Sequence, residues 1–165
     1  MIASMSRTLE ISTVLDCPTE TAWHHARTSR LLHYVTHPLI RFRPKHENGF
    51  PAFWTEGDYD ASMWLFGVLP LGRQTIGIRY PDTSDNTFVL RDDGHGTTAS
   101  VWDHYIIISE RDGGTLYTDR ITVDAGWRTP FVAAFASLFY RHRQRRWRKL
   151  VRSGFALLEA GERAA

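Results

Sequence analysis

The sequence predicts an α+β protein in which a curved, seven-stranded antiparallel sheet packs across one long C-terminal helix. A single long helical pattern covers residues 129–152, and seven shorter strand-like runs precede it. Most of these runs are joined by short turns, which force neighbouring strands to run antiparallel. A sheet with one apolar face needs a helix across it, and only the C-terminal pattern is long enough.

Composition indicates one globular domain over residues 1–165. Of the 165 residues, 42% are hydrophobic and 23% are charged, which is enough apolar surface for one substantial core. Cys17 is the single cysteine, so no intrachain disulfide can form. The N-terminus shows no signal-peptide pattern, and no apolar stretch reaches the roughly 18 residues of a membrane span. We therefore expect a cytoplasmic protein without a transmembrane segment.

The helical pattern over residues 129–152 changes character at its middle. Thr129 is a plausible N-cap, and Pro130 suits the first helical position, where its missing N–H costs nothing. Residues 131–140 are apolar on nearly every side, whereas residues 141–152 hold seven Lys or Arg and no acid. The first half should therefore cover an apolar interior, while the second should run into solvent. Gly154 need not end the helix, which we expect to extend to about residue 160.

The other elements follow in a simple order. Residues 7–16 form the first expected strand, and a short helix begins near Pro18. A second short helix over residues 30–36 must end before Pro38, because the residue before a proline is pushed away from helical geometry. Glycine-rich turns at 67–72, 92–96 and 112–114 separate later strands, and the last of these is a strong hairpin signal. The remaining strands are expected over residues 39–45, 58–66, 73–80, 87–91, 97–109 and 115–124.

Together, these features resemble the START-like, or Bet v 1-like (SRPBCC), superfamily, most closely its bacterial polyketide cyclase/dehydrase-type branch. The resemblance rests on the element order, on CPTETAW (17–23) leading into the short helices, on FGVLPLG (66–72), and on GGTLYTD (113–119) leading to the last helix. It covers about residues 7–152. It implies a helix-grip fold, with the sheet wrapped around the last helix and a deep cavity between them. Members bind lipids, sterols, polyketides, hormones or other apolar small molecules. A minority are enzymes, others dock on proteins, ribosomes or respiratory-chain lipids, and no catalytic residue set is universal.

Asp119 is the candidate catalytic residue. On the last expected strand it shares a face with Tyr117, Ile121 and Val123, so it points inward if that face lines the cavity. Apolar surroundings would raise the pKa of its carboxyl group and suit it to acid–base work. Two alternatives stay open: Asp119 pairs with an arginine such as Arg79, or the strand register differs by one residue.

The register of the preceding strand is also open. Asp103 and Tyr105 alternate with Trp102 and His104, so one pair faces the cavity and the other faces away. His33 and His37 have metal-ligand spacing, but Pro38 unwinds the helix and no third ligand is evident, so we expect neither a metal nor a cofactor. In the family fold both histidines lie near the cavity mouth. The expected ligand-binding residues are His33, His37, Tyr59, Met63, Ile78, Tyr105, Tyr117, Asp119, Phe135, Phe139 and Arg143.

Arg143 differs from the other cations of the basic half. It follows Ala136 and Tyr140 at helical spacing, together with Trp147, so it lies near the face toward the sheet. There it could pair with an acid or bind a ligand anion. The remaining cations are distributed around the helix, which favours a solvated helix end and disfavours nucleic acid, whose phosphates would need a one-sided stripe.

Three functions remain in competition. The favoured one is binding of an apolar small molecule that enters near Val68 and Leu69. The second is an enzyme of the polyketide cyclase/dehydrase kind, which needs at least two convergent titratable groups inside the cavity. The third is an interaction protein that uses the basic helix half on RNA or on an anionic membrane surface. The sequence leaves the ligand, the choice between carrier and enzyme, and the oligomeric state open.

Overall fold

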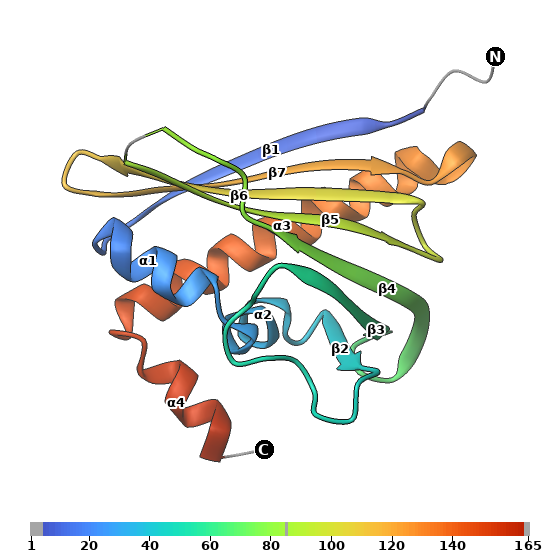
Figure 1. Ribbon diagram of the computed structural model, residues 1–165, viewed down its shortest axis with the longest axis horizontal. Helices are drawn as coiled ribbons and strands as arrows, with labels where there is room; N and C mark the ends of the chain where they lie inside the picture. Colours follow the sequence, from blue (N-terminus) through green and yellow to red (C-terminus); the bar gives the residue numbers. More distant parts are fainter. Residues whose placement is uncertain (1–4, 85, 164–165) are drawn as a thin grey trace.

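The computed structural model describes residues 5–84 and 86–163 and contains a seven-stranded antiparallel sheet packed on a long helix (Figure 1). The strands lie in the order β1-β7-β6-β5-β4-β3-β2, so β1 closes against the last strand and the others follow as a meander. The predicted fold class is confirmed. The elements are β1 (Arg7–Leu15), α1 (Thr19–Ala26), α2 (Ser29–Thr36), β2 (Ile40–Pro44), β3 (Gly57–Leu65), β4 (Leu69–Arg79), β5 (Thr87–Gly96), β6 (Val101–Arg111), β7 (Gly114–Asp124), the 3₁₀ turn η1 (Gly126–Arg128), α3 (Thr129–Arg152) and α4 (Ala156–Arg163).

The two short helices carry the chain from one edge of the sheet to the other. Strand β1 pairs with β7, from Arg7 opposite Val123 to Leu15 opposite Thr115, whereas β2 pairs with β3 at the far edge. Between them, α1 and α2 lie at one end of the sheet (Figure 1). The N-cap of α2 is Thr28, whose hydroxyl oxygen accepts from the Leu31 amide at 3.2 Å. This crossing encloses the space between the sheet and α3.

Strand β5 is longer than the sequence predicts. The segment Asp92–Gly96, expected as a turn, continues the strand to Gly96, and the chain reverses at residues 97–100 instead. Gly94 serves close packing here, because a Cβ at this position would lie 2.8 Å from Gln74 Nε2 and 3.0 Å from Asp92 Oδ1. Gly94 is therefore required here because the side chains of Gln74 and Asp92 leave no room for a Cβ atom. By contrast, the hairpin expected at Asp112–Gly114 is confirmed, with positive φ at Asp112 (48°) and Gly113 (78°).

The ends of α3 differ from the prediction at both termini. Arg128 occupies the N-cap position, and Thr129 is already helical. The Thr129 hydroxyl serves the preceding turn: it donates to the Gly126 carbonyl at 2.7 Å and accepts from the Ala125 amide at 2.9 Å. At the other end α3 stops at Arg152, because Gly154 (φ 59°) and Phe155 (φ 67°) turn the chain into the separate helix α4.

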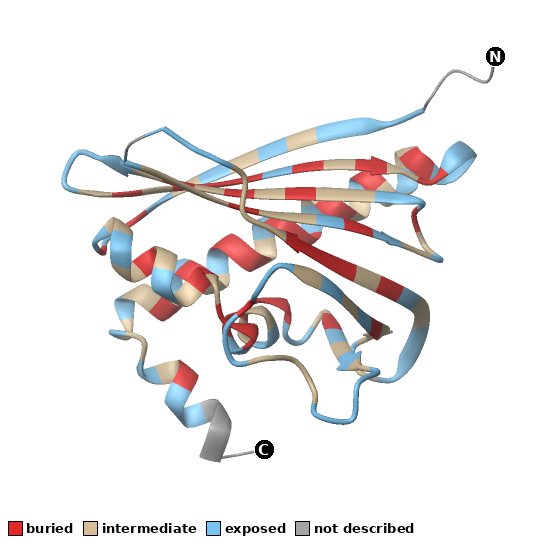
Figure 2. Ribbon diagram, viewed as in Figure 1, coloured by how far each residue is buried: buried red, intermediate tan, exposed pale blue. Residues whose placement is uncertain are grey.

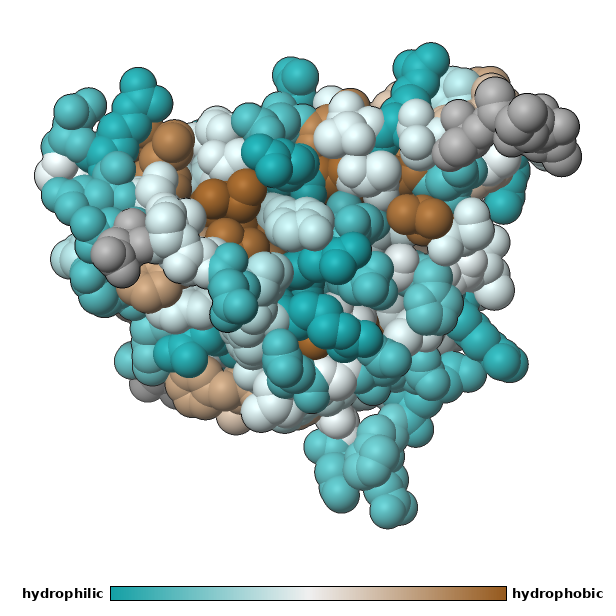
Figure 3. Space-filling view, turned by 45° about the horizontal axis from the view of Figure 1, so that its top comes forward, coloured by the Kyte–Doolittle hydropathy of each residue, from teal (hydrophilic) through white to brown (hydrophobic). Residues whose placement is uncertain are grey.

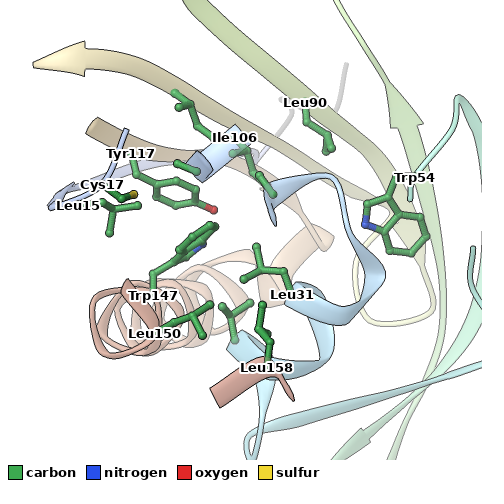
Figure 4. Close-up of a cluster of buried hydrophobic side chains, with 14 of the residues drawn as sticks. Leu15, Cys17, Leu31, Trp54, Leu90, Ile106, Tyr117, Trp147, Leu150 and Leu158 are labelled. Carbon is green, nitrogen blue, oxygen red and sulfur yellow. The ribbon is translucent and has the colours of Figure 1, made fainter. Parts of the chain in front are cut away.

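The core lies between the sheet and one side of α3. Buried positions follow the side of α3 that faces the strands (Figure 2). The largest fully buried side chains include Trp147 and Tyr117, whose ring centroids lie 5.2 Å apart (Figure 4). Burying each such aromatic side chain stabilises the fold by roughly 1.5–3 kcal/mol. The basic half of α3 is thus anchored on the sheet along one side.

The opposite side of α3 is open to solvent. Leu138 is 63% exposed, and Arg141, Arg145 and Arg148 are exposed after it at helical spacing. Arg146 is used internally, since its Nε donates to the Tyr34 carbonyl at 2.6 Å. Small apolar areas stand among hydrophilic side chains on the face shown in Figure 3. None of the helices within residues 5–84 and 86–163 is long and apolar enough to cross a membrane.

Candidate functional site

A cavity lies between the inner face of the sheet, the two short helices and the middle of α3. The volume open to the centres of water-sized molecules is ≈ 100 Å³, room for roughly seven to ten waters or for a ligand with a similar number of non-hydrogen atoms. Its wall is formed by Ala26, Thr28, Leu31, Leu32, Ile40, Phe42, Trp54, Met63, Leu71, Gln74, Ile76, Ile78, Leu90, Asp92, Thr98, Trp102, Ile106, Phe135, Phe139, Tyr140 and Arg143.

Strand alternation explains why this wall is mostly apolar. Along β4, Gln74, Ile76 and Ile78 share the inner face, and along β5 Leu90 and Asp92 do so. Ile78 pairs directly with Asp92 across the two strands. The polar side chains Gln74 and Asp92 therefore stand next to apolar neighbours on adjacent strands. Across the cavity from them, α3 contributes Tyr140 and Arg143.

Arg143 is a buried cation in the wall of this cavity. The residue is 5% exposed, and its guanidinium lies over the rings of Tyr140 and Phe139, at 5.1 and 5.8 Å from their centroids. Its Nε–H is buried and has no hydrogen-bond acceptor. Arginine stays protonated in proteins, so a positive charge stands at this wall.

Asp92 is the acidic residue of the cavity wall. Its Oδ1 accepts from the Gly77 amide at 2.8 Å, at the point where the β4–β5 pairing opens between Thr75 and Ile78. Burial raises the pKa of the Asp92 carboxyl to about 7, against the opposing effects of the Gly77 amide and of Arg143. The side chain is surrounded by protein yet keeps some accessible area, because it borders the cavity. It can therefore exchange a proton near neutral pH.

Asp119 belongs to a second buried network, which adjoins Arg143 because Tyr117 and Asp119 both act on the Arg143 guanidinium. Its Oδ1 accepts from His104 Nε2 at 2.7 Å and from the Tyr117 hydroxyl at 3.2 Å, and its Oδ2 accepts from Gln144 Nε2 at 3.0 Å. Burial lowers the pKa of His104, although the hydrogen bond to Asp119 opposes this effect, so His104 is neutral and donates its Nε2–H. Neither Asp119 nor His104 borders the cavity. The network ties β6 and β7 to α3.

This arrangement answers the questions of register. The Asp119 side chain is fully buried, and Arg79 pairs instead with Asp58 at 2.8 Å. On β6, His104 faces inward, whereas Asp103 faces outward and its Oδ1 accepts from Arg91 Nε at 2.8 Å.

Eight of the eleven expected ligand-binding residues fall into three places. Tyr117 and Asp119 are buried behind the cavity wall, in the network around His104. Tyr59 packs on Trp54 at a centroid distance of 5.1 Å, with its hydroxyl donating to the Thr55 carbonyl at 3.0 Å. The residues that do line the cavity are Met63, Ile78, Phe135, Phe139 and Arg143.

Three further candidates lie away from the cavity. Tyr105 faces outward because it alternates with the inward His104, and it packs under Arg91 at 5.2 Å. His33 packs against Phe50, with ring centroids 5.7 Å apart. His37 is exposed, and its carbonyl accepts from His142 Nε2 at 2.9 Å. Among the side chains that the structure describes, no group of three or more His, Cys, Asp or Glu could hold a metal ion.

Sequence reasoning missed Asp92 and Gln74. Gln74 lies at the start of the strand expected over residues 73–80, and Asp92 lies in the turn expected at residues 92–96, which the structure shows to be part of β5. A usable signal existed, because Leu90, Asp92 and Gly94 alternate with Arg91 and Asp93 as a continued strand would.

The fold is shared with solved structures of very different sequence. Protein CV1439 from Chromobacterium violaceum superposes with a TM-score of 0.60 at 13% identity, over 87% of this chain and 96% of that one. Ara h 8.0201 gives a TM-score of 0.61 at 14% identity, over 90% and 99%. Hypothetical protein jhp0584 from Helicobacter pylori gives 0.60 at 8% identity, over 88% of each chain. These likenesses show a Bet v 1-like helix-grip fold.

The family itself is defined by sequence. Residues 12–151 match the model of a domain of unknown function, DUF8410, and the chain therefore belongs to that family. No curated protein matches the sequence. The function must accordingly be argued from the cavity and its residues.

Proposed function

We propose that this protein binds an apolar small molecule in the cavity between the sheet and α3. The supporting observation is the cavity itself, an apolar-walled space of ≈ 100 Å³ in the part of the fold where side chains would otherwise pack solidly. The apolar part of such a wall favours apolar molecules, since water gains little by lying against it.

The size of the cavity sets the expected affinity. A ligand of about ten non-hydrogen atoms would bury roughly 200–300 Å² of apolar surface, worth about 5–7 kcal/mol. Association costs at least several kcal/mol, so dissociation constants in the millimolar range or weaker are expected unless polar contacts add to the binding. Any polar contact at the wall would thus contribute strongly to selectivity.

The turn between β3 and β4 is the proposed opening. Phe66, Val68 and Leu69 are 60%, 77% and 55% exposed, and Leu71, two residues farther along β4, already lines the cavity. These side chains would give an entering ligand an apolar path from the surface to the interior. Such exposed apolar side chains favour the capture of apolar molecules.

The test is calorimetric titration with 1-octanol, an uncharged apolar molecule of suitable size. We expect saturable binding to the wild-type protein and a loss of about tenfold in affinity for Ile78→Phe, which fills the cavity. The matched control is Ile107→Phe, the same change on the outer side of β6, which should leave binding within about twofold. Equal binding by both variants, or no binding to the wild type, would refute the proposal.

A second candidate function is catalysis on a polyketide-like substrate. Asp119 does not support this function, because its carboxyl group is hydrogen-bonded to His104 and Gln144 away from the cavity. Asp92 does support it, because its pKa of about 7 suits proton transfer to and from a ligand. The minimal reaction is proton removal at the carbon between two carbonyl groups. Deuterium exchange of acetylacetone, followed by NMR, should be faster with wild type than with Asp92→Asn if this function is real; equal rates would exclude it.

The basic side of α3 supports a third, weaker candidate. The exposed Arg141, Arg145 and Arg148 follow the exposed Leu138 along one side of the helix, which suits an anionic membrane surface better than RNA. Co-sedimentation with vesicles containing phosphatidylserine at low salt, but not with neutral vesicles, is the expected result. Indifference to vesicle charge would remove this candidate.

A further inference from the structure

Arg143 distinguishes the cavity from a purely apolar one. Among the side chains that the structure describes, four buried polar atoms have no hydrogen-bond partner: Arg27 Nε, Tyr34 Oη, Arg143 Nε and Trp147 Nε1. Of these, the Arg143 atom belongs to a side chain in the cavity wall. A buried donor without an acceptor costs about 1–3 kcal/mol, and more when the group is charged. The buried Nε does not itself border the cavity, so a ligand would offset this cost through the other N–H groups of the same guanidinium.

The position of the guanidinium is fixed by its neighbours. The rings of Tyr140 and Phe139 lie beside it on the same helix, and the Tyr140 hydroxyl is itself held by Trp102 Nε1, which donates to it at 3.0 Å. No ion pair joins Arg143 to an acidic side chain within residues 5–84 and 86–160. A rigid, planar and buried cation of this kind suits the two oxygens of a carboxylate.

We propose that the natural ligand is an apolar molecule bearing a carboxylate, with its head group on Arg143 and its apolar body among Ile76, Ile78 and Leu90. The inference rests on the proposed binding function and specifies the ligand class for the same cavity. Gln74 is a further polar side chain of the wall, on the inner face of β4 next to Ile76. An uncharged ligand of equal size would leave the Arg143 cation without a counter-charge.

The protonation state of Asp92 affects how well this subsite binds a carboxylate. The charged or titratable groups that act on it are Arg143 and Tyr140 from α3, Asp103 from β6 and Asp93 from its own strand. A ligand carboxylate beside it would repel its anionic form and favour the protonated one, which then donates a hydrogen bond. Octanoate binding near neutral pH should therefore be accompanied by proton uptake.

The experiment compares octanoate with 1-octanol, which have the same chain length and differ in charge. Calorimetric titration should show that the wild type prefers octanoate by at least about tenfold. Arg143→Met should abolish that preference, so that the ratio of the octanoate and 1-octanol affinities falls to about one. Arg145→Met, the same change on the exposed side of α3, should behave as wild type. In two buffers of different ionisation enthalpy, the octanoate titration should reveal proton uptake.

The outcomes separate the two proposals. If 1-octanol binds and octanoate binds no better, or if Arg143→Met keeps the preference, the carboxylate subsite is refuted and the apolar cavity stands. If Arg145→Met weakens octanoate as much as Arg143→Met does, binding is superficial and the subsite is again refuted. If neither molecule binds, both proposals fall. Should Arg143→Met not fold, the wild-type preference and its proton uptake decide alone, and absence of either one refutes the subsite.

Discussion

Two groups of polar side chains are buried between the sheet and α3, and they differ in how fully they are paired. Around Asp119, three donors from His104, Tyr117 and Gln144 converge on one carboxyl group. Around Asp92 and Arg143, one donor is without an acceptor. The first group lies behind the cavity wall, whereas the second forms part of that wall.

The contrast separates a structural role from a binding role. A buried carboxyl group with several donors holds elements together, and here it joins two strands to the helix that covers them. An incompletely paired charge lowers stability and survives where a ligand or water completes it. Burial alone would have ranked Asp119 first as a functional residue, since it is the more buried of the two acids. Asp92 ranks first instead when hydrogen-bond pairing and access to the cavity are considered.

The largest expected effect comes from Asp119→Ala. The change leaves the His104, Tyr117 and Gln144 donors buried without their acceptor, so we expect the free energy of unfolding to fall by about 3–5 kcal/mol. Urea unfolding followed by circular dichroism measures it. The control is Asp58→Ala, which removes an exposed pair with Arg79 and should cost less than about 1 kcal/mol. Equal losses from the two changes would show that the network is not structural.

Asp92→Asn should alter how stability depends on pH. The folded pKa of Asp92 is raised from 3.8 to about 7, so the folded state holds its proton more tightly than the unfolded state does. This contribution is fully present below about pH 4 and is lost as the pH rises through 7, by at most about 4 kcal/mol. Asparagine keeps an acceptor for the Gly77 amide and does not ionise.

Unfolding curves at several pH values test this difference. The variant should gain stability relative to wild type as the pH is raised from about 4 to 8, with most of the change between about pH 4 and 7. Asp58→Asn, at an exposed position on β3, is the matched control and should show no such trend. A constant difference between Asp92→Asn and wild type would mean that Asp92 titrates normally.

How far the sequence predicts this molecule depends on the scale considered. Alternation and turn signals suffice for the sheet, the helix pair and α3, because each reports local geometry that tertiary packing preserves. Glycines mislead at Asp92–Gly96, where they serve close packing between strands, and at the end of α3, where Gly154 does stop the helix. Local sequence does not distinguish these uses of glycine.

The site was harder to predict than the fold. Met63, Ile78 and Phe139 were recoverable because inward faces follow from alternation and helical spacing. The partners of Asp119 were not, since His104 and Gln144 lie 15 and 25 residues away and reach it only through the sheet register and the helix rotation. A register assignment that is wrong by one residue exchanges Tyr105 for His104 and hides the network entirely.

Gln144→Leu should have an intermediate effect. Gln144 Nε2 donates to Asp119 Oδ2 at 3.0 Å and to the Ile11 carbonyl at 2.6 Å. Leucine has no donor, so each of these two oxygens loses one hydrogen bond. We expect about 1–2 kcal/mol of destabilisation in urea and an unchanged preference for octanoate over 1-octanol. A lost preference would mean that the two polar groups act as one unit, contrary to the comparison.

Tyr105→Phe should have the smallest effect. The ring stays under Arg91 on the outer side of β6, so stability should change by less than about 0.5 kcal/mol and octanoate affinity should remain within about twofold. Tyr140→Phe is its counterpart on the inner side: it removes the hydroxyl that accepts from Trp102 Nε1 beside Arg143, so it should weaken octanoate binding more than Tyr105→Phe does. Equal octanoate affinities in the two variants would place the ligand away from the Arg143 end of the cavity.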